Sequence, residues 1–176
     1  MKPILFTTIG GPGSGKSYFT SNLTQSIPMV RLNNDAMRTA LFDEPMLPEN
    51  MHNYRTIYGA MDYATRASLQ AGMSVIYDAN VNQRELREKN VQIAAETGAD
   101  AITLWVKTPF DVCVQRVTSR NITDEQFRVG SETVKKHFDS LEEPDDTERV
   151  IIIDGTATPD EQIQQFRSQL SQLQDS

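Results

Sequence analysis

The chain has 176 residues, of which 38% are hydrophobic and 23% are charged, and its formal net charge is −7. This length is enough for one hydrophobic core, so we expect a single domain over residues 1–176 that folds without a disulfide or a structural metal. The lone Cys113 excludes an internal disulfide, and the helical pattern around it favours a small core residue over a reactive thiol. No leader-like segment or bilayer-spanning apolar stretch is found, which predicts a cytoplasmic protein without a membrane partner.

Apolar, β-branched runs alternate along the chain with segments of helical period. Strands are expected within residues 4–9, 29–33, 73–79, 100–107 and 149–154. Helices are expected at about 16–26, 35–42, 51–71, 82–97, 109–120, 123–140 and 159–173. Asp35 and Asn82 suit helix N-caps, and Gly72 and Gly98 suit helix C-termini. The alternation predicts an α/β fold, with a parallel sheet covered by helices on both faces.

The charges are distributed unevenly. Residues 1–42 contain four Lys or Arg against one Asp, whereas residues 141–176 contain two Lys or Arg against nine acidic residues. The overall acidity therefore affects solubility and long-range steering, and it does not decide what binds at the basic N-terminal segment.

A glycine-rich motif interrupts the first apolar run. Gly10, Gly15, Lys16 and Ser17 match G-x-x-x-x-G-K-[ST], directly after a predicted strand and at the start of a predicted helix. Glycines let backbone N–H groups approach an anion, the helix start adds positive potential, the Lys contacts the β and γ phosphates, and the Ser hydroxyl binds Mg²⁺. We expect this loop to hold a polyphosphate through Gly11, Gly13, Ser14, Gly15, Lys16, Ser17 and Tyr18.

Two missing motifs favour phosphoryl transfer over hydrolysis or switching. The N-K-x-D element of guanine-specific switches does not occur in the sequence. Asp78, in VIYDAN, is followed by Ala79 where a motor ATPase usually has a catalytic Glu. Without groups that activate water, transfer to a different acceptor is the favoured reaction.

A second acidic centre follows the second predicted strand, in RLNNDAMRTAL. Asp35 and Arg38 are three residues apart and share a helix face. At the carboxyl end of a strand, where open α/β sheets bind ligands, a carboxylate can accept the proton of an acceptor hydroxyl. The alternative is that Asp35 only caps the helix and Arg38 is a solvated charge.

Asp78 ends the third predicted strand at the same edge of the sheet. We expect it to hold Mg²⁺ together with Ser17, or to bridge to Arg38; the alternative is a local turn or cap. Asn80 and Asn82 either add neutral hydrogen bonds to this site or fix the strand-to-helix turn.

Two arginines of VQRVTSR are candidates for nucleotide contacts. Arg116 and Arg120 are four residues apart, before the polar turn NITDEQ, and predict a short helical lid around residues 116–130 that grips phosphate oxygens. The alternative puts both on an exposed face near acidic side chains. Arg84 and Arg87 are predicted to be surface or acceptor-side charges.

Four stretches, TIGGPGSGKS, NNDAMR, VIYDANVNQRELR and VQRVTSR, resemble the polynucleotide-kinase and zeta-toxin-like group of P-loop kinases. Within that group the chain is most similar to the kinase domain of bacteriophage 5′-polynucleotide kinase. The resemblance implies a three-layer P-loop NTPase fold with a five-stranded parallel sheet in the order 2-3-1-4-5. It also implies ATP and Mg²⁺ as cofactors, Asp35 as general base, Arg38 near both the acceptor and Asp78, and Arg120 on the transferred phosphate.

The leading function on these grounds is an ATP-dependent kinase that phosphorylates the 5′-OH of a polynucleotide, with a single-stranded nucleic-acid end as partner and no protein partner. One alternative is a kinase of the same fold that acts on a sugar, an antibiotic or a nucleotide-sugar. Another is a regulatory module that binds ATP without transfer. The segment after Arg120 lacks the run of basic residues expected around a polynucleotide channel, so the acceptor stays open.

Overall fold

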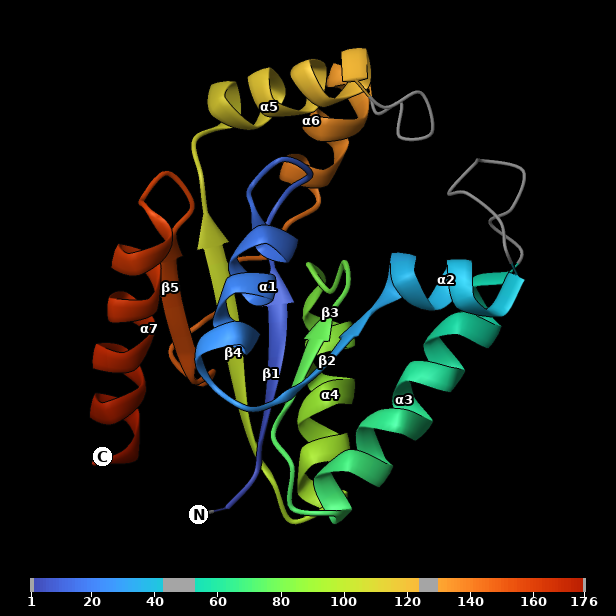
Figure 1. The fold of residues 1–176 in the computed structure, drawn as a ribbon, viewed down its shortest axis with the longest axis vertical. Helices are drawn as coiled ribbons and strands as arrows, with labels where there is room; N and C mark the ends of the chain where they lie inside the picture. Colours follow the sequence, from blue (N-terminus) through green and yellow to red (C-terminus); the bar gives the residue numbers. More distant parts are fainter. Residues whose placement is uncertain (1, 43–52, 124–129, 176) are drawn as a thin grey trace.

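The computed structural model describes residues 2–42, 53–123 and 130–175. Five parallel strands form one sheet in the order β2-β3-β1-β4-β5, which confirms the predicted fold class and strand order (Figure 1). The strands are β1 Ile4–Ile9, β2 Val30–Asn33, β3 Val75–Asp78, β4 Asp100–Lys107 and β5 Val150–Asp154. The helices are α1 Lys16–Ser26, α2 Asn34–Phe42, α3 Tyr54–Gln70, α4 Arg84–Glu96, α5 Phe110–Thr123, α6 Ser131–Asp139 and α7 Pro159–Gln174.

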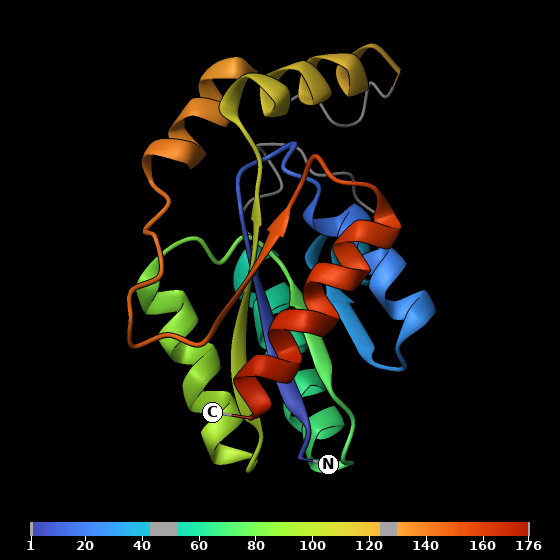
Figure 2. The same ribbon diagram turned by 90° about the vertical axis from the view of Figure 1, so that its left-hand side faces the viewer.

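Helices cover both faces of the sheet and give three layers (Figures 1 and 2). On one face α1 and α7 pack on the sheet, and the Phe166 ring lies 5.4 Å from that of Phe6 and 6.3 Å from that of Phe19. On the other face, Leu5 of β1 packs with Ile57 of α3 in a second core. Because neighbouring strand residues face opposite sides, β1 supplies both cores and is buried throughout.

Helices α5 and α6 lie beyond the carboxyl end of the sheet, near the turn from β1 to α1 (Figure 1). They join through a small core that includes Cys113 and Val134, with Phe138 packed against it. Cys113 is fully buried and burial raises the pKa of its thiol, which confirms the predicted core role. The predicted lid over 116–130 falls partly on these helices and partly on residues 124–129, outside the described residues.

Two helix starts differ from the prediction. The cap of α2 is Asn33, whose Oδ1 accepts the Ala36 N–H at 2.9 Å, so Asp35 lies inside the first turn and is not the N-cap. The N-cap of α4 is Gln83, and the Asn82 side chain bonds to the β1–α1 turn instead. In the first case Asn33 has the better-placed backbone partner, and in the second the Asn82 side chain is already bonded to Gly10.

The helix predicted over 123–140 begins later, at Ser131 of α6, and α5 runs to Thr123 instead of ending near 120, whereas the two predicted C-terminal glycines are confirmed. Gly72 and Gly98 follow α3 and α4 with φ angles of 80° and 69°, which glycine adopts without a Cβ clash. Helix α7 begins at Pro159 after Thr158, which forms a reciprocal capping box with Glu161. Among the helices that the structure describes, none is long and apolar enough to cross a bilayer.

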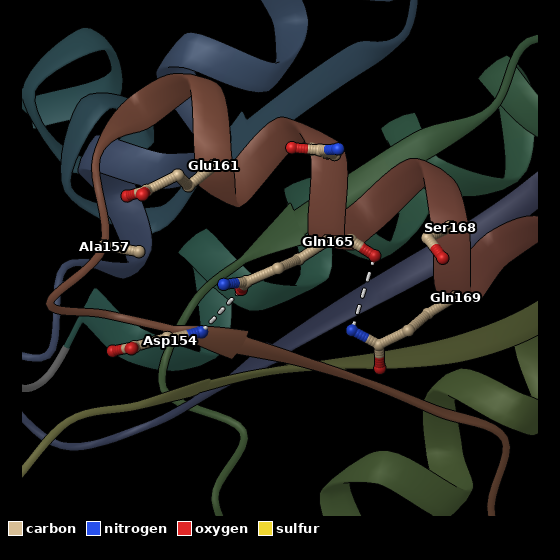
Figure 3. Close-up of a pocket in the computed structure, with 7 residues that line it drawn as sticks. Asp154, Ala157, Glu161, Gln165, Ser168 and Gln169 are labelled. Carbon is tan, nitrogen blue, oxygen red and sulfur yellow. Dashed lines mark hydrogen bonds between the residues drawn. The ribbon is translucent and has the colours of Figure 1, made fainter.

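Glutamine side chains of α7 cover the outer edge of β5 (Figure 3). Gln169 bonds to both the N–H and the C=O of Ile152, at 2.9 and 2.7 Å. Gln165 accepts the Asp154 N–H at 2.9 Å, and Gln162 donates to the Asp154 C=O at 2.9 Å. The spacing of the three glutamines puts their amides on one face of α7. They thus satisfy the backbone groups that this edge strand turns away from β4.

The residue after β5 fits only as glycine. A Cβ atom at Gly155 would overlap Thr108 Oγ1 and the Ser14 carbonyl oxygen. We therefore expect Gly155→Ala to lower the free energy of unfolding by about 1–3 kcal/mol, as overpacking does in close-packed regions. Chemical denaturation measures this change.

Gly59 provides the matched control. It lies inside α3, and a Cβ added there has no neighbour within 4 Å. Gly59→Ala should raise the free energy of unfolding by about 0.5–1 kcal/mol, because alanine is the better helix former. Equal effects of the two substitutions would contradict the steric argument.

Candidate active site

The P-loop, residues 10–17, turns the chain from β1 into α1. Gly10, Gly13 and Gly15 have φ angles of 142°, 80° and 100°, which side-chain-bearing residues rarely adopt. The first intrahelical bond of α1 runs from the Phe19 N–H to the Gly15 C=O, so the amides before Phe19 have no partner within the helix. Backbone amides at a helix start, after such a turn, form a site for a phosphate group.

Lys16 lies across the inside of this loop. Its Nζ donates to the carbonyl oxygens of Gly10 at 2.7 Å and Gly11 at 3.1 Å. The loop also packs tightly against α6, because a Cβ atom at Gly11 would overlap the Phe138 ring. Glycine at this position therefore allows the α5–α6 pair to sit directly on the P-loop.

Asn82 holds the first glycine of the P-loop. Its Oδ1 accepts the Gly10 N–H at 2.9 Å and its Nδ2 donates to the Gly10 C=O at 3.3 Å, in a buried position. Behind it, the buried Arg87 donates to the Asn82 C=O at 2.9 Å and to both carboxylate oxygens of Glu148, at 2.6 and 2.8 Å. Arg87 is thus a structural group and not the predicted surface or acceptor-side charge, whereas Arg84 is exposed as predicted.

Asp78 ends β3 beside the P-loop, with its side chain only 2% exposed. Its Oδ1 lies 3.4 Å from Ser17 Oγ. A carboxylate and a hydroxyl next to a phosphate site are the hard oxygen ligands that Mg²⁺ prefers. The two residues therefore fit the metal role that the sequence predicts for them.

The arginine that contacts Asp78 is Arg31, where the sequence predicts Arg38. Arg31 donates to Asp78 Oδ2 from Nη2 at 2.6 Å and from Nε at 2.9 Å. It can do so because β2 pairs directly with β3. Arg38 lies on α2 and faces α3, with its guanidinium carbon 5.0 Å from the centroid of the Tyr54 ring. The sequence motif gave no sign of Arg31, because its partner is 47 residues away.

Asp35 and two tyrosines form the part of the site next to α2 and α3. Asp35, Tyr54 and Tyr58 line the central cavity, and the two tyrosine rings pack at 5.9 Å. Burial, with the nearby Tyr54 and Asp35, raises the pKa of Tyr58 to about 12, so its phenol stays neutral. Arg38 is buried beneath Tyr54. A contact between Arg38 and the acceptor stays a prediction.

Arg116 reaches from α5 to the P-loop. Its Nη1 donates to the Gly155 C=O at 2.9 Å and lies 3.4 Å from the Gly13 carbonyl oxygen. It also lines the cavity, within reach of the loop that would hold phosphates. Arg120 lies on α5 as well, but its side chain is outside the described residues. Nucleotide contact by either arginine stays a prediction.

His137 of α6 is a group that sequence reasoning missed, because no metal-ligand spacing marks it. Its Nδ1 lies 2.9 Å from Asn80 Nδ2, and both residues line the cavity. Burial, and then the charge of Lys16, lower the pKa of His137. A neutral imidazole thus stands beside the phosphate-binding loop.

One cavity of about 810 Å³ lies at the carboxyl edge of the sheet, and its lining includes Lys16, Ser17, Asp35, Asp78, Arg116 and His137. Its lining residues come from the P-loop, from α2 and α3, and from α5 and α6. Tyr18, at 61% exposure, also lines it. Its size is within the range of pockets that bind nucleotides and other small molecules.

A family model described as an AAA domain matches residues 5–144. The chain belongs to this AAA-domain family. No curated protein matches its sequence significantly. The match spans β1 to the end of α6, and therefore includes the P-loop and every cavity-lining residue described above.

Solved structures similar to this AAA-domain protein include kinases. A gluconokinase from Sinorhizobium meliloti 1021 has a TM-score of 0.69 and 17% identity, covering 98% of this chain and 94% of that one. The Mycobacterium tuberculosis APS kinase CysC, in complex with AMPPNP and APS, has a TM-score of 0.69 and 17% identity, covering 97% of this chain and 98% of that one. At this identity the likeness shows the fold, which is that of P-loop kinases.

A third match is a chain of the Pnkp1/Rnl/Hen1 RNA repair complex, with a TM-score of 0.69 and 26% identity. It covers 79% of the AAA-domain protein and only 44% of the RNA repair chain. The predicted kinase group is thus supported, while the finer resemblance to bacteriophage polynucleotide kinase stays a prediction.

The contact between Asn82 and Gly10 can be tested with Asn82→Leu, which keeps a similar volume. The buried Gly10 N–H loses its partner, while the Gly10 C=O keeps the bond from Lys16 Nζ, so the free energy of unfolding should fall by about 1–3 kcal/mol. Because the loop is then less firmly held in its binding shape, the dissociation constant for ATP should rise about tenfold. Isothermal calorimetry measures it.

The matched control is Gln83→Leu, one residue further on. Gln83 is exposed and its side chain makes no capping hydrogen bond. This variant should bind ATP like the wild type. Unchanged ATP affinity in Asn82→Leu would show that the P-loop does not depend on this contact.

The lowered pKa of His137 predicts a pH effect on stability. The folded protein holds this proton less tightly than the unfolded chain, whose histidine pKa is about 6.5. The unfolded state therefore binds more protons as the pH falls through that value, and stability decreases until the lower folded pKa is passed. Between about pH 7.5 and 5.5, thermal unfolding should show a larger loss of stability in the wild type than in His137→Asn. Parallel pH curves would contradict this.

Proposed function

We propose that the protein is a kinase that transfers the γ-phosphate of ATP to a hydroxyl group of a small molecule. The observation that carries the proposal is that Lys16 of the P-loop and Asp35 of α2 line the same cavity. A module that only binds nucleotide has no use for a carboxylate in the space next to the phosphate site. A kinase needs one there, to receive the proton of the acceptor.

Ser17 and Asp78 are the residues that would hold Mg²⁺. Among the residues that the structure describes, no three His, Cys, Asp or Glu side chains gather into a dedicated metal cage. This donor set suits Mg²⁺, which usually takes one or two protein ligands and completes its shell with phosphate oxygens and water. When bound, the ion neutralises charge on the β and γ phosphates.

In the transfer step, the acceptor oxygen attacks the γ-phosphorus and the bond to the β,γ-bridging oxygen breaks, so that ADP leaves. Asp35 accepts the proton of the acceptor hydroxyl and orients its oxygen. Lys16 and the P-loop amides hold the phosphate oxygens. Arg116 lines the cavity from α5, and we assign to it and to Arg120 of the same helix the role of offsetting the charge of the triphosphate.

Two observations favour a small acceptor over a polynucleotide end. The gluconokinase and APS kinase structures match 98% and 97% of this chain, whereas the RNA repair chain matches 79% of it. In addition, Arg38 is 2% exposed and covered by Tyr54, so its charge is not displayed to a nucleic-acid backbone. Sugars, antibiotics and nucleotide-sugars are the candidate acceptors.

The acceptor class is tested by incubating the protein with γ-labelled ATP, Mg²⁺ and either small hydroxyl compounds or 5′-OH oligonucleotides. Label on a small compound supports the proposal. Label on the oligonucleotide would replace it with polynucleotide 5′ phosphorylation. Tight ATP binding with no labelled product would favour a regulatory module.

Asp35→Asn should slow transfer by about 10²–10⁴-fold, the usual contribution of a general base, and leave ATP affinity nearly unchanged. Asp100→Asn is the matched control, because Asp100 begins β4 at the opposite end of the sheet and pairs with Lys2. It should transfer at the wild-type rate. Normal turnover by Asp35→Asn with the true acceptor would exclude Asp35 as the base.

A further inference from the structure

The two oxygens of the Asp78 carboxylate have different surroundings. Oδ2 accepts hydrogen bonds from Nε and Nη2 of Arg31 at 2.9 and 2.6 Å, from Asn33 Nδ2 at 3.0 Å and from Thr20 Oγ1 at 3.1 Å. Oδ1 instead faces Ser17 Oγ at 3.4 Å. One oxygen is therefore committed to the protein scaffold, and the other is directed at the P-loop.

Arg31 is the main cause of this difference. It lies on β2 two residues before Asn33, which pairs with Asp78 across the sheet, so both side chains reach the carboxylate from one face. The contact is charge-assisted and uses two nitrogens of a planar group, which fixes the orientation better than a lysine ammonium can. Arg31 Nε also donates to Thr20 Oγ1 at 2.9 Å, which connects β2 to α1 directly below the P-loop.

We propose that Arg31 is a positioning residue for the divalent cation that accompanies ATP. By holding Oδ2, it keeps Oδ1 directed at Ser17, where the cation or its bound water is received. This inference rests on the proposed ATP and Mg²⁺ site. It does not depend on the acceptor or on the transfer step.

Two effects of Arg31 on the cation have opposite signs. Its positive charge repels a nearby cation, so charge alone predicts stronger Mg²⁺ binding once Arg31 is removed. Its geometry predicts weaker binding, because groups that hydrogen-bond to metal ligands typically contribute about 10–100-fold to metal affinity. Arg31 supplies two of the four hydrogen bonds that Asp78 Oδ2 accepts, so its removal chiefly frees the orientation of the carboxylate, and we expect weaker Mg²⁺ binding.

The experiment measures the dissociation constant of ATP by calorimetry, on the full chain, in excess Mg²⁺ and in EDTA. The ratio of the two constants reports how strongly the cation and ATP assist each other. In Arg31→Met we expect this ratio to fall about tenfold, with the value in EDTA nearly that of the wild type. Arg31→Lys keeps the charge and loses the two-nitrogen contact, so its ratio should fall nearly as far as that of Arg31→Met.

Arg66→Met is the matched control, because it breaks an exposed ion pair with Glu96 at 3.1 Å. It should keep the wild-type ratio. Circular dichroism checks that each variant is folded. If Arg31→Met does not fold, the result for Arg31→Lys decides the test.

Several results would overturn the inference. An unchanged ratio in Arg31→Met would show that Arg31 does not position the cation ligand. A larger ratio would show that Arg31 acts on the cation only through charge repulsion. A wild-type ratio in Arg31→Lys would show that the charge of Arg31, and not its two-nitrogen contact, is what the cation site needs. Loss of ATP affinity in EDTA would mean that Arg31 supports the loop and not the cation. A wild type that does not bind ATP overturns the proposed function as well, whereas Mg²⁺-dependent ATP binding that survives in the variants overturns this inference alone.

Discussion

The parallel pairing of β1, β2 and β3 is the constraint on which the whole site depends. It brings the ends of these strands to one edge, where β1 continues into the P-loop and Asn33 lies opposite Asp78. Hydrogen bonds from Asn82 to Gly10 and from Ser17 to Asp78 can form only in this register. A shift of β3 by one residue would turn Asp78 to the other face of the sheet, because strand side chains alternate.

Buried ionic groups around the P-loop are paired within the scaffold. Arg31 neutralises Asp78, and Arg87 binds Glu148 through both carboxylate oxygens. Removing one partner of such a pair leaves an uncompensated buried charge, which is strongly destabilising. These arginines therefore fix the strands and loops that carry the site. Lys16, by contrast, lines the cavity where the phosphates of a nucleotide would lie.

The parts of the site that could be predicted from sequence are those with a local signature. The P-loop glycines, Lys16 and Ser17 form one continuous motif, Asp35 follows β2 and Asp78 ends β3, so the fold alone brings them together. The strand order was available only through the family resemblance. Periodicity shows that strands alternate with helices, and it says little about which strand lies beside which.

The contacts that were missed join distant parts of the chain. Arg31 and Asp78 are 47 residues apart, Asn80 and His137 are 57 apart, and Asn82 and Gly10 are 72 apart. No local pattern encodes such pairs. The burial of Arg87 was missed for the same reason, since its partner Glu148 comes from the loop before β5.

The glutamine-covered border of β5 limits how copies of this protein can associate. An outer strand normally offers unpaired backbone groups to any extended polypeptide, which is a common route to misassembly. Here an approaching chain would first have to displace Gln165 and Gln169 from the backbone of Asp154 and Ile152. Intermolecular sheet extension on that side is thereby opposed by α7 itself.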